Sequence, residues 1–334
     1  MTRLLPAVLK EARHIMLDCL LMIGCILMMS CGGDDSLQPQ SGGEMQDVLI
    51  VGENKTAVLR TTDMLQHVMM RQLPQQEHLF QVSAVHGSLT EATRYARCIL
   101  MVEVDASTYT RPSIRYERDV YAQPQYIIHL RAASANQVAG RALQQQLTRL
   151  LDRMQMKMEL RYLARHHDAN ALRHSQRMMG ADIWIPTDLT YEKTARQFLW
   201  FSNDDAKRMR NICVYSWKGT SLDTKDWINK RDSVMKCNMP GEERNMYMQT
   251  DRESVTMTPT ETDKKMLHKQ QALTVRGLWQ MRNDAMGGPF VALSRIDTVH
   301  GRIITAEAFV YAPGEQKCNL IRSLEACLHS MKLK

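Results

Sequence analysis

The run Ala272-Leu-Thr-Val-Arg-Gly-Leu-Trp-Gln-Met281 is followed by Phe290-Val-Ala-Leu-Ser-Arg-Ile296 and Arg302-Ile-Ile-Thr-Ala-Glu-Ala-Phe-Val-Tyr311, and these three runs decide the fold class. They predict three long strands. Thr298-Val299-His300-Gly301 predicts the hairpin loop between the last two. An amphipathic helix is predicted after them, over residues 315–331. We therefore expect an α+β fold in which an antiparallel sheet carries helices on one face.

The elements before these strands extend the same C-terminal half. Shorter strands are predicted over residues 183–186, 197–201 and 211–217. A helix is predicted over residues 222–236, with Ser221 placed to cap it. The C-terminal α+β subdomain is expected to span residues 180–334.

The N-terminal half predicts an α/β arrangement, because strands and helices alternate along it. Its strands are predicted over residues 47–51, 79–85, 98–104, 114–121 and 126–130. A helix is predicted over residues 56–72, before the second strand, and another over residues 90–97, before the third. One long linking helix over residues 134–165 and a second over residues 169–179, ending at Gly180, close this subdomain of residues 46–179.

The first thirty residues have the order of a bacterial signal peptide. Arg3, Lys10 and Arg13 precede an apolar run over residues 19–29, which is too short for a membrane-spanning helix of about 20 residues. Ser30-Cys31 then resembles the cleavage site of the lipoprotein signal peptidase. We expect cleavage of residues 1–30 and lipid attachment at Cys31, with Cys25 as a second candidate. A buried N-terminal helix of a cytosolic protein is the alternative.

A flexible tether is predicted over residues 31–45, because the segment after the cysteine is rich in glycine, serine and proline. Asp34 and Asp35 resemble the acidic signal that sends some Bacteroidetes lipoproteins to the cell surface, although they also suit a solvated linker. The expected location is the cell envelope, lipid-anchored to the outer membrane on its periplasmic face or at the cell surface.

Charge and cysteine usage exclude several classes. The net charge is +7, of which the first thirty residues carry +1. The charges are dispersed, so no nucleic-acid partner is expected. Five of the eight cysteines follow Cys31, an odd number without close pairs, and this is not a disulfide framework.

Several short motifs together resemble a family of Bacteroidetes envelope lipoproteins, the domain of unknown function 4837. They are Arg118-Asp-Val-Tyr-Ala-Gln-Pro-Gln125, Phe198-Leu-Trp200, Lys230-Arg-Asp232, Arg276-Gly-Leu-Trp279, Met286-Gly-Gly-Pro-Phe-Val291 and Phe309-Val-Tyr-Ala-Pro313. The resemblance extends over nearly all of the chain after residue 30. It implies a lipid anchor and assigns no activity. Tyr121 stands where the family pattern has tryptophan, so an aromatic is kept.

The densest group of metal-ligand types is His166, His167, Asp168 and His174. His167 and His174 would lie two helical turns apart, about 10 Å at 1.5 Å per residue, too far for one zinc ion. A polar turn between helices explains the group better. Because the chain also contains no P-loop, nucleophile elbow or dinucleotide fingerprint, no metal, cofactor or catalytic residue is predicted.

The segment 276–290 is the candidate binding surface. Glycine and proline give its loop a specified shape, and the tip would present charged side chains beside a large aromatic. The alternative is an ordinary hairpin turn with Trp279 in the core. The candidate residues are Arg276, Trp279, Arg282, Asp284, Met286, Gly287 and Gly288.

Two functions follow from these observations. The first is a non-catalytic binding or structural module of the envelope whose partner is a protein, a glycan or a lipid. The second is a periplasmic or surface enzyme, hydrolase-like, with a site assembled only in the fold. The absence of known catalytic motifs favours the first.

Overall fold

The computed structural model describes residues 38–70, 73–222, 224–262 and 270–334. Residues 40–334 form one compact unit. The predicted signal peptide and Cys31 lie outside the described residues. Within the described part of the chain, no helix is both long enough and apolar enough to cross a membrane.

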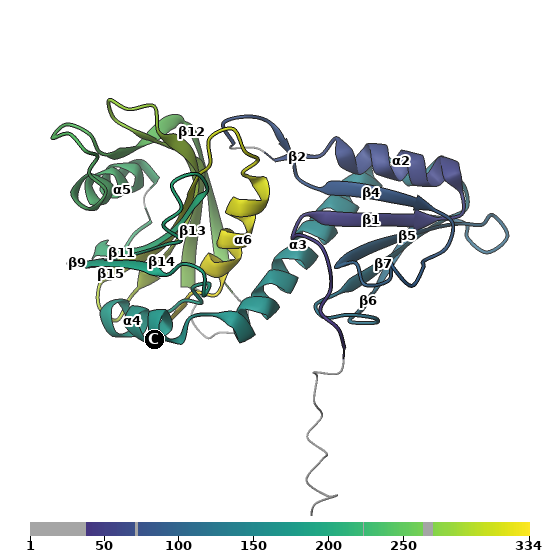
Figure 1. Ribbon diagram of the computed structural model, residues 1–334, viewed down its shortest axis with the longest axis horizontal. Helices are drawn as coiled ribbons and strands as arrows, with labels where there is room; N and C mark the ends of the chain where they lie inside the picture. The colour runs from purple at the N-terminus through teal and green to yellow at the C-terminus, as the bar shows by residue number, and fades with distance from the viewer. Residues whose placement is uncertain (1–37, 71–72, 223, 263–269) are drawn as a thin grey trace, which may run out of the picture. The chain divides into compact units, whose positions relative to one another are not determined.

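The N-terminal half is built on a five-stranded sheet with the order β4-β1-β5-β7-β6 (Figure 1). Its parallel strands are β4 (Gln81–His86), β1 (Asp47–Gly52), β5 (Cys98–Val104) and β7 (Tyr126–Ala132). The edge strand β6 (Ser113–Arg118) runs antiparallel to β7. The predicted α/β alternation is therefore confirmed for this half.

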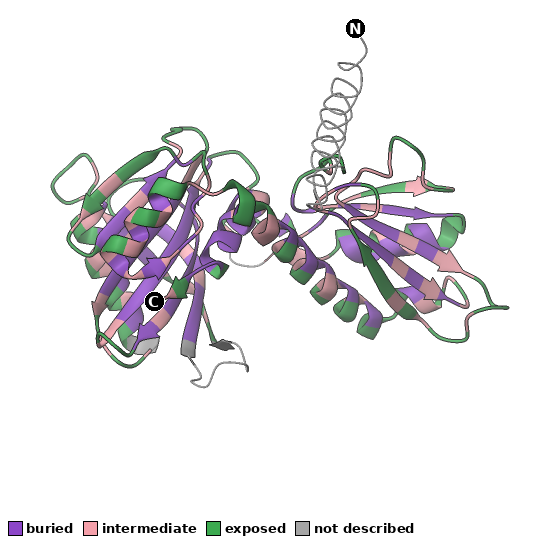
Figure 2. Ribbon diagram, turned by 90° about the horizontal axis from the view of Figure 1, so that it is seen from below, coloured by how far each residue is buried: buried purple, intermediate pink, exposed green. Residues whose placement is uncertain are grey.

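Two helices cover one face of this sheet. Helix α2 (Lys55–Gln66) and helix α3 (Arg141–His166) bury aliphatic and methionine side chains against it, while Val51, Ile99 and Ile127 face a smaller cluster on the other side. The side of α3 away from this core is largely exposed (Figure 2). Successive residues of β1 therefore face two different apolar clusters, and this explains why the strand is apolar throughout.

Three predictions in this half are wrong in detail. Helix α2 ends at Gln66, and two short strands, β2 (Met69–Met70) and β3 (Glu77–His78), follow it. Residues 91–95 form turns in place of the predicted helix, because Thr90 and Thr93 hydrogen-bond each other's backbone amides. The long helix starts only at Arg141, after a 3-10 turn (Gln137–Ala139) and Gly140.

The C-terminal half is built on a seven-stranded antiparallel sheet with the order β12-β13-β14-β15-β11-β10-β9. Its bounds are β9 (Tyr191–Ala195), β10 (Phe198–Ser202), β11 (Met209–Lys218), β12 (Met248–Thr262), β13 (Gln270–Met281), β14 (Gly287–Asp297) and β15 (Arg302–Tyr311). The three long strands predicted from the sequence are β13, β14 and β15, which lie side by side within this sheet. The sequence did not predict the edge strands β9 and β12.

The fold class is confirmed as α+β, although helices cover both faces of this sheet and not the single face expected. Helices α4 (Ala169–Met179) and α6 (Cys318–His329) pack on one face. Helix α5 (Thr224–Asn238) packs on the other, around Trp227 and Met235. The central strands are buried on both faces, so one layer of helices would leave the second apolar face in water.

The connection between the halves follows local capping rules. The Asp168 carboxylate accepts hydrogen bonds from the backbone amides of Asn170 and Ala171, at 2.7 and 2.9 Å, and caps α4. Gly180 ends the helix at a φ of 63°. Strand β8 (Ala181–Asp182) then pairs with β16 (Lys332–Leu333), and the predicted strand over residues 183–186 is absent. The predicted division at residue 180 stays a prediction.

Candidate functional site

The predicted binding segment forms the hairpin between β13 and β14, and its residues do not converge on one surface. Side chains alternate along a strand, so Arg276 and Trp279 face opposite sides of the sheet. Arg276 forms an ion pair with Glu325 of α6. Trp279 is 2 % exposed in the core under α5, where its ring N–H donates to the carbonyl of Val310. The position of Trp279 is the one that the ordinary-hairpin alternative requires.

The tip of this hairpin is also tied to its neighbours. The Arg282 guanidinium lies over the ring of Tyr247 and donates to its hydroxyl at 2.7 Å. Met286 is partly buried against the core under α5, and its carbonyl accepts from the amide of Met281. Asp284 is exposed and accepts from the amide of Ala285. A recognition role for this tip stays a prediction.

Gly288 has a packing role at the start of β14. A Cβ atom on Gly288 would lie 2.0 Å from the carbonyl oxygen of Val310 and 3.2 Å from the indole nitrogen of Trp279. A methyl group at this position would therefore force two strands apart. At both glycines the neighbouring backbone approaches too closely for a Cβ atom, and a ligand role for the pair stays a prediction.

We expect Gly288→Ala to lower the free energy of unfolding by about 1–3 kcal/mol, because overpacking displaces backbone that cannot relax. Urea denaturation measures this change. Gly42→Ala is the matched control, because nothing lies within 4 Å of its Cβ position. An unchanged denaturation midpoint for Gly288→Ala would contradict the packing argument.

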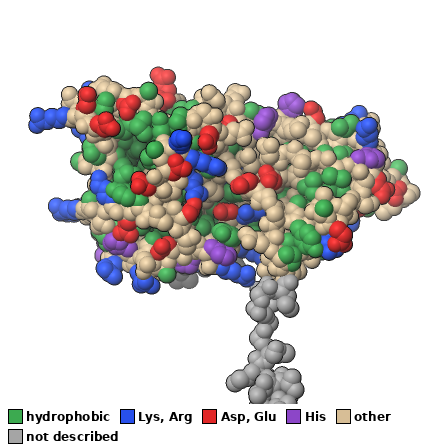
Figure 3. All heavy atoms as spheres, viewed as in Figure 1, with side chains coloured by type: hydrophobic (Ala, Val, Ile, Leu, Met, Phe, Trp, Pro, Cys, Tyr) green, Lys and Arg blue, Asp and Glu red, His purple; other side chains and the backbone are tan. Residues whose placement is uncertain are grey.

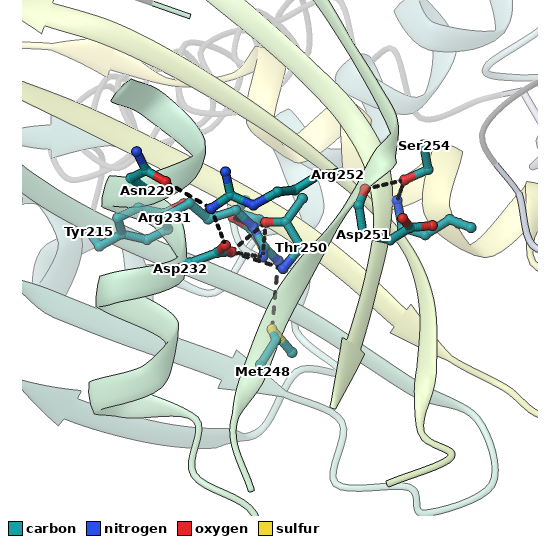
Figure 4. A network of polar contacts seen from close by, with 11 residues as sticks. Tyr215, Asn229, Arg231, Asp232, Met248, Thr250, Asp251, Arg252 and Ser254 are labelled. Carbon is teal, nitrogen blue, oxygen red and sulfur yellow. Dashed lines mark hydrogen bonds and ion pairs between the residues drawn. The ribbon is translucent and has the colours of Figure 1, made fainter. Parts of the chain in front are cut away.

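A buried network of charged and polar side chains joins α5 to the sheet (Figure 4). Arg231 and Glu307 have fully buried side chains, and Nη2 of Arg231 lies 2.6 Å from Oε1 of Glu307. The Tyr215 hydroxyl donates to the other oxygen of Glu307 at 2.7 Å. Burial alone would lower the pKa of Arg231, but the charge and hydrogen bonds of Glu307, together with Tyr215 and Asp232, outweigh it and raise that pKa. Burial, together with Glu307, raises the pKa of Tyr215 well above its ordinary value.

The other polar groups of the network also have hydrogen-bond partners. Nη1 of Arg231 donates to the Thr250 hydroxyl at 2.9 Å, and the Asp232 carboxylate accepts from the backbone amide of Thr250. The indole of Trp227 donates to Ser294 at 2.8 Å. This network explains the motif Lys230-Arg-Asp232 as a structural connection between helix and sheet.

The histidine group forms a polar turn. His166 stacks on Tyr162, and His167 stacks on Trp184. Asp168 caps α4, and His174 pairs with Glu192 of β9. Each member has a separate partner, so the geometry does not assemble the four side chains around one metal ion.

Helix α6 holds the N-terminal half through two charged contacts. The Glu77 carboxylate of β3 accepts from the backbone amides of Lys317 and Cys318, at 2.7–2.9 Å, at the start of α6. Arg322 is 2 % exposed and donates to Asp152 at 2.7 Å and to Gln155 at 2.9 Å, both on α3. Helices α3 and α6 therefore meet through ionic contacts within one compact unit.

A cavity of about 740 Å³ opens beside this meeting of α3 and α6, and we call it the Arg276 pocket. It contains one residue of the predicted binding segment, Arg276. One part of its lining is apolar and the other charged. The lining residues are Met69, Met70, Leu79, Asp152, Arg153, Met156, Lys157, Leu160, Arg276, Arg322, Glu325 and His329. Sequence analysis missed all of these except Arg276.

Three charged or titratable side chains that line the Arg276 pocket contact one another. Glu325 pairs with Arg276, and His329 lies 3.4 Å from the same carboxylate oxygen. Burial opposes ionisation of Glu325, but the Arg276 charge and the hydrogen bonds from His329 and Arg276 lower its pKa to about 2. Nη1 of Arg276 is buried and has no hydrogen-bond partner.

A second cavity of about 570 Å³, lined in part by Arg97 and Arg210, lies on another side of the same two helices. Two of its three carboxylates are in ion pairs, and the third, Glu44, accepts a hydrogen bond from Asn319. Glu159 lies 2.7 Å from Arg97, and Asp188 pairs with Arg210. Burial lowers the pKa of Arg210. This cavity is polar and its charges balance, unlike those of the Arg276 pocket.

Comparison with known proteins identifies two families and no described activity. Residues 41–165 match a domain of unknown function (DUF8532), and residues 168–330 match a domain of unknown function (DUF4837). The motif at residues 118–125 therefore falls in the first match, and the resemblance to the second family is narrower than the sequence implied. No curated protein matches the chain.

Two solved structures are weakly similar. The Saccharomyces cerevisiae Ran-binding protein Mog1p is 9 % identical, with a TM-score of 0.29, over 46 % of this chain and 90 % of that one. A point mutant of protein Mog1 is 8 % identical, with a TM-score of 0.28 and the same two shares. Similarity at this level supports no inference about function. By the family match, residues 168–330 of the chain carry a domain of the DUF4837 family, a domain of unknown function.

Proposed function

We propose that this protein is a non-catalytic binding module of the bacterial cell envelope, anchored by lipid at Cys31, with the Arg276 pocket as its ligand site. The observation that carries the proposal is the composition of this pocket. It is a preformed cavity of about 740 Å³ with an apolar wall and a few convergent polar groups. Cavities of roughly 300–1,000 Å³ with that composition are typical of small-molecule sites.

The ionic contacts support binding over hydrolysis. Acid–base catalysis requires a carboxyl group that can exchange a proton near the working pH. In the Arg276 pocket, Glu325 is held ionised with a pKa of about 2, and Asp152 is paired with Arg322. These carboxylates position arginines, which suits a site that holds a ligand.

The mixed charge of the surface is consistent with a water-soluble domain held beside a membrane by a lipid. Charged side chains of both signs are interspersed over the face seen in Figure 3, without one dominant block. Such a surface keeps a domain soluble beside a membrane while a lipid supplies the attachment. The proposed location is the outer membrane.

A photo-crosslinking experiment tests the site without assuming the ligand's class. Arg153 is exposed and lines the Arg276 pocket, so p-benzoylphenylalanine at position 153 points a reactive group at any occupant. Gln145 is exposed on the same helix, about 12 Å away at 1.5 Å per residue, and provides the matched control.

We expect irradiation of cells making the full chain to give an adduct of one defined mass at position 153 and none at position 145. Intact-protein mass spectrometry reads both variants. Equal adducts at the two positions, or none at position 153, would overturn the assignment of the pocket as a binding site.

A further inference from the structure

We infer that the Arg276 pocket takes a single-chain amphiphile with an anionic headgroup, a carboxylate or a phosphate ester. The inference rests on the proposed function, because it names the ligand class of the same site. Three features of the pocket support it: its charge, an unused donor and its apolar wall.

The pocket has an excess of positive charge. Four lining side chains are cationic at neutral pH, and two are carboxylates. Both carboxylates are already paired, Asp152 with Arg322 and Glu325 with Arg276. The net charge left for a ligand comes from Arg153 and Lys157 of α3, which lie at the exposed rim. An anionic headgroup complements this charge, whereas a cationic one would be repelled.

One donor in the pocket remains unused. The Arg276 guanidinium gives Nη2 to Glu325, while its buried Nη1 has no hydrogen-bond partner. A buried unsatisfied donor costs free energy, and a charged donor costs more than a neutral one. A carboxylate or phosphate oxygen is the acceptor that arginine prefers. The headgroup is therefore placed at the partly exposed Arg276 side chain, whose buried Nη1 reaches it once the guanidinium turns toward the pocket.

The other part of the lining is hydrocarbon and thioether. Met69, Met70 and Leu79 come from the segment that follows α2, and Met156 and Leu160 come from α3. Met156, Leu160 and Met70 are only partly buried against the C-terminal core. Methionine side chains adapt to irregular apolar ligands. A polar anion such as free phosphate would leave this wall unused, and an alkyl chain would cover it.

The first test compares ligands on one protein, the full-length chain with Cys31→Ala. Isothermal titration calorimetry is run with octyl phosphate, hexyl phosphate, inorganic phosphate and octyl glucoside. We expect one octyl phosphate per chain. Because each buried methylene contributes about 0.8 kcal/mol, hexyl phosphate should bind about 10- to 20-fold more weakly. Inorganic phosphate and octyl glucoside should each bind more weakly than octyl phosphate.

Two results overturn the inference. Equal affinity for octyl phosphate and inorganic phosphate would reduce the pocket to a simple anion site. Equal affinity for octyl phosphate and octyl glucoside would remove the anionic headgroup. If octyl phosphate does not bind but position 153 still cross-links a different molecule, the ligand class is wrong and the proposed function stands. If neither experiment gives a signal, both fall.

The second test uses substitutions with opposite expected signs. Glu325→Gln removes the carboxylate that neutralises Arg276, so octyl phosphate should bind more tightly. Arg276→Gln together with Glu325→Gln removes both charges and should weaken binding roughly 10- to 100-fold relative to Glu325→Gln alone. Glu103→Gln, which breaks a pair with Arg131 outside this pocket, is the matched control and should leave binding unchanged. Identical affinities in all four proteins would overturn the headgroup assignment. The ligand series on the unsubstituted pocket stays decisive if a variant fails to fold.

Discussion

Glu307→Gln is expected to lower the free energy of unfolding by about 3–5 kcal/mol, because it leaves the Arg231 charge buried without its counter-ion. Both side chains of this pair are fully buried, so water cannot replace the lost carboxylate. Tyr215 would also donate to a neutral amide oxygen in place of a charged one. Urea denaturation followed by tryptophan fluorescence measures the change, because Trp227 lies in the same core.

Two controls separate burial from charge. Lys230 and Asp226 form a pair on the same helix with exposures of 48 % and 61 %, and their nitrogen and oxygen lie 3.9 Å apart. Lys230→Ala should change stability by no more than about 0.5 kcal/mol, because solvent screens exposed pairs. Arg231→Met combined with Glu307→Leu should recover much of the stability lost in Glu307→Gln, because apolar replacement of a buried pair is often tolerated. A fully stable Glu307→Gln protein would show that the pair is not the ionic centre of this half.

The fold was predictable where local patterns decide it. The helix over residues 169–179 was predicted to the residue, because Gly180 supplies a left-handed C-cap that the sequence makes visible. The central strands were predicted because they are long runs rich in apolar and β-branched residues. The edge strand β12 was not, since its residues are polar, alternate weakly and gain their strand conformation from pairing with β13.

The candidate site was predictable only in one residue, Arg276. Among the other residues that line the pocket, Glu325 and Arg322 lie about 50 positions further on, and Asp152 and Met70 lie in the other half of the chain. Only tertiary packing brings such residues together. One signal was available: Arg322 and Glu325 are charged residues within the most apolar helix of the C-terminal half. Buried charged residues of this kind are almost always paired and therefore point to a partner elsewhere in the chain.

The hairpin between β13 and β14 shows the reverse case. Glycine, proline and tryptophan in one short segment suggested recognition, but the same residues are what a tight approach of strands requires. Gly288 leaves room for the Val310 carbonyl, and Trp279 fills the core beside it. Packing therefore accounts for Gly288 and Trp279, while recognition by the exposed tip stays a prediction.

Membrane attachment is expected to depend on a single residue, Cys31, and the sequence alone supports this expectation. A cationic segment, an apolar run over residues 19–29 and Ser30-Cys31 follow one another in the order of a lipoprotein signal. Each methylene placed in a bilayer contributes about 0.8 kcal/mol, so several acyl chains on one cysteine hold a protein durably where one chain would not. Removing the cysteine that carries them should therefore remove nearly all of the attachment.

Cys31→Ala is expected to abolish incorporation of an alkyne fatty acid and to move most of the protein from the membrane fraction to the soluble fraction. Cys25→Ala is the matched control, because it removes the other cysteine next to a small residue in the same segment. That variant should keep both the label and the membrane fraction of the unsubstituted chain. Undiminished labelling of Cys31→Ala, with loss of label in Cys25→Ala, would move the anchor to Cys25. Undiminished label in both variants would show that neither Cys31 nor Cys25 is required for lipid attachment, and would overturn the assignment of the anchor to Cys31.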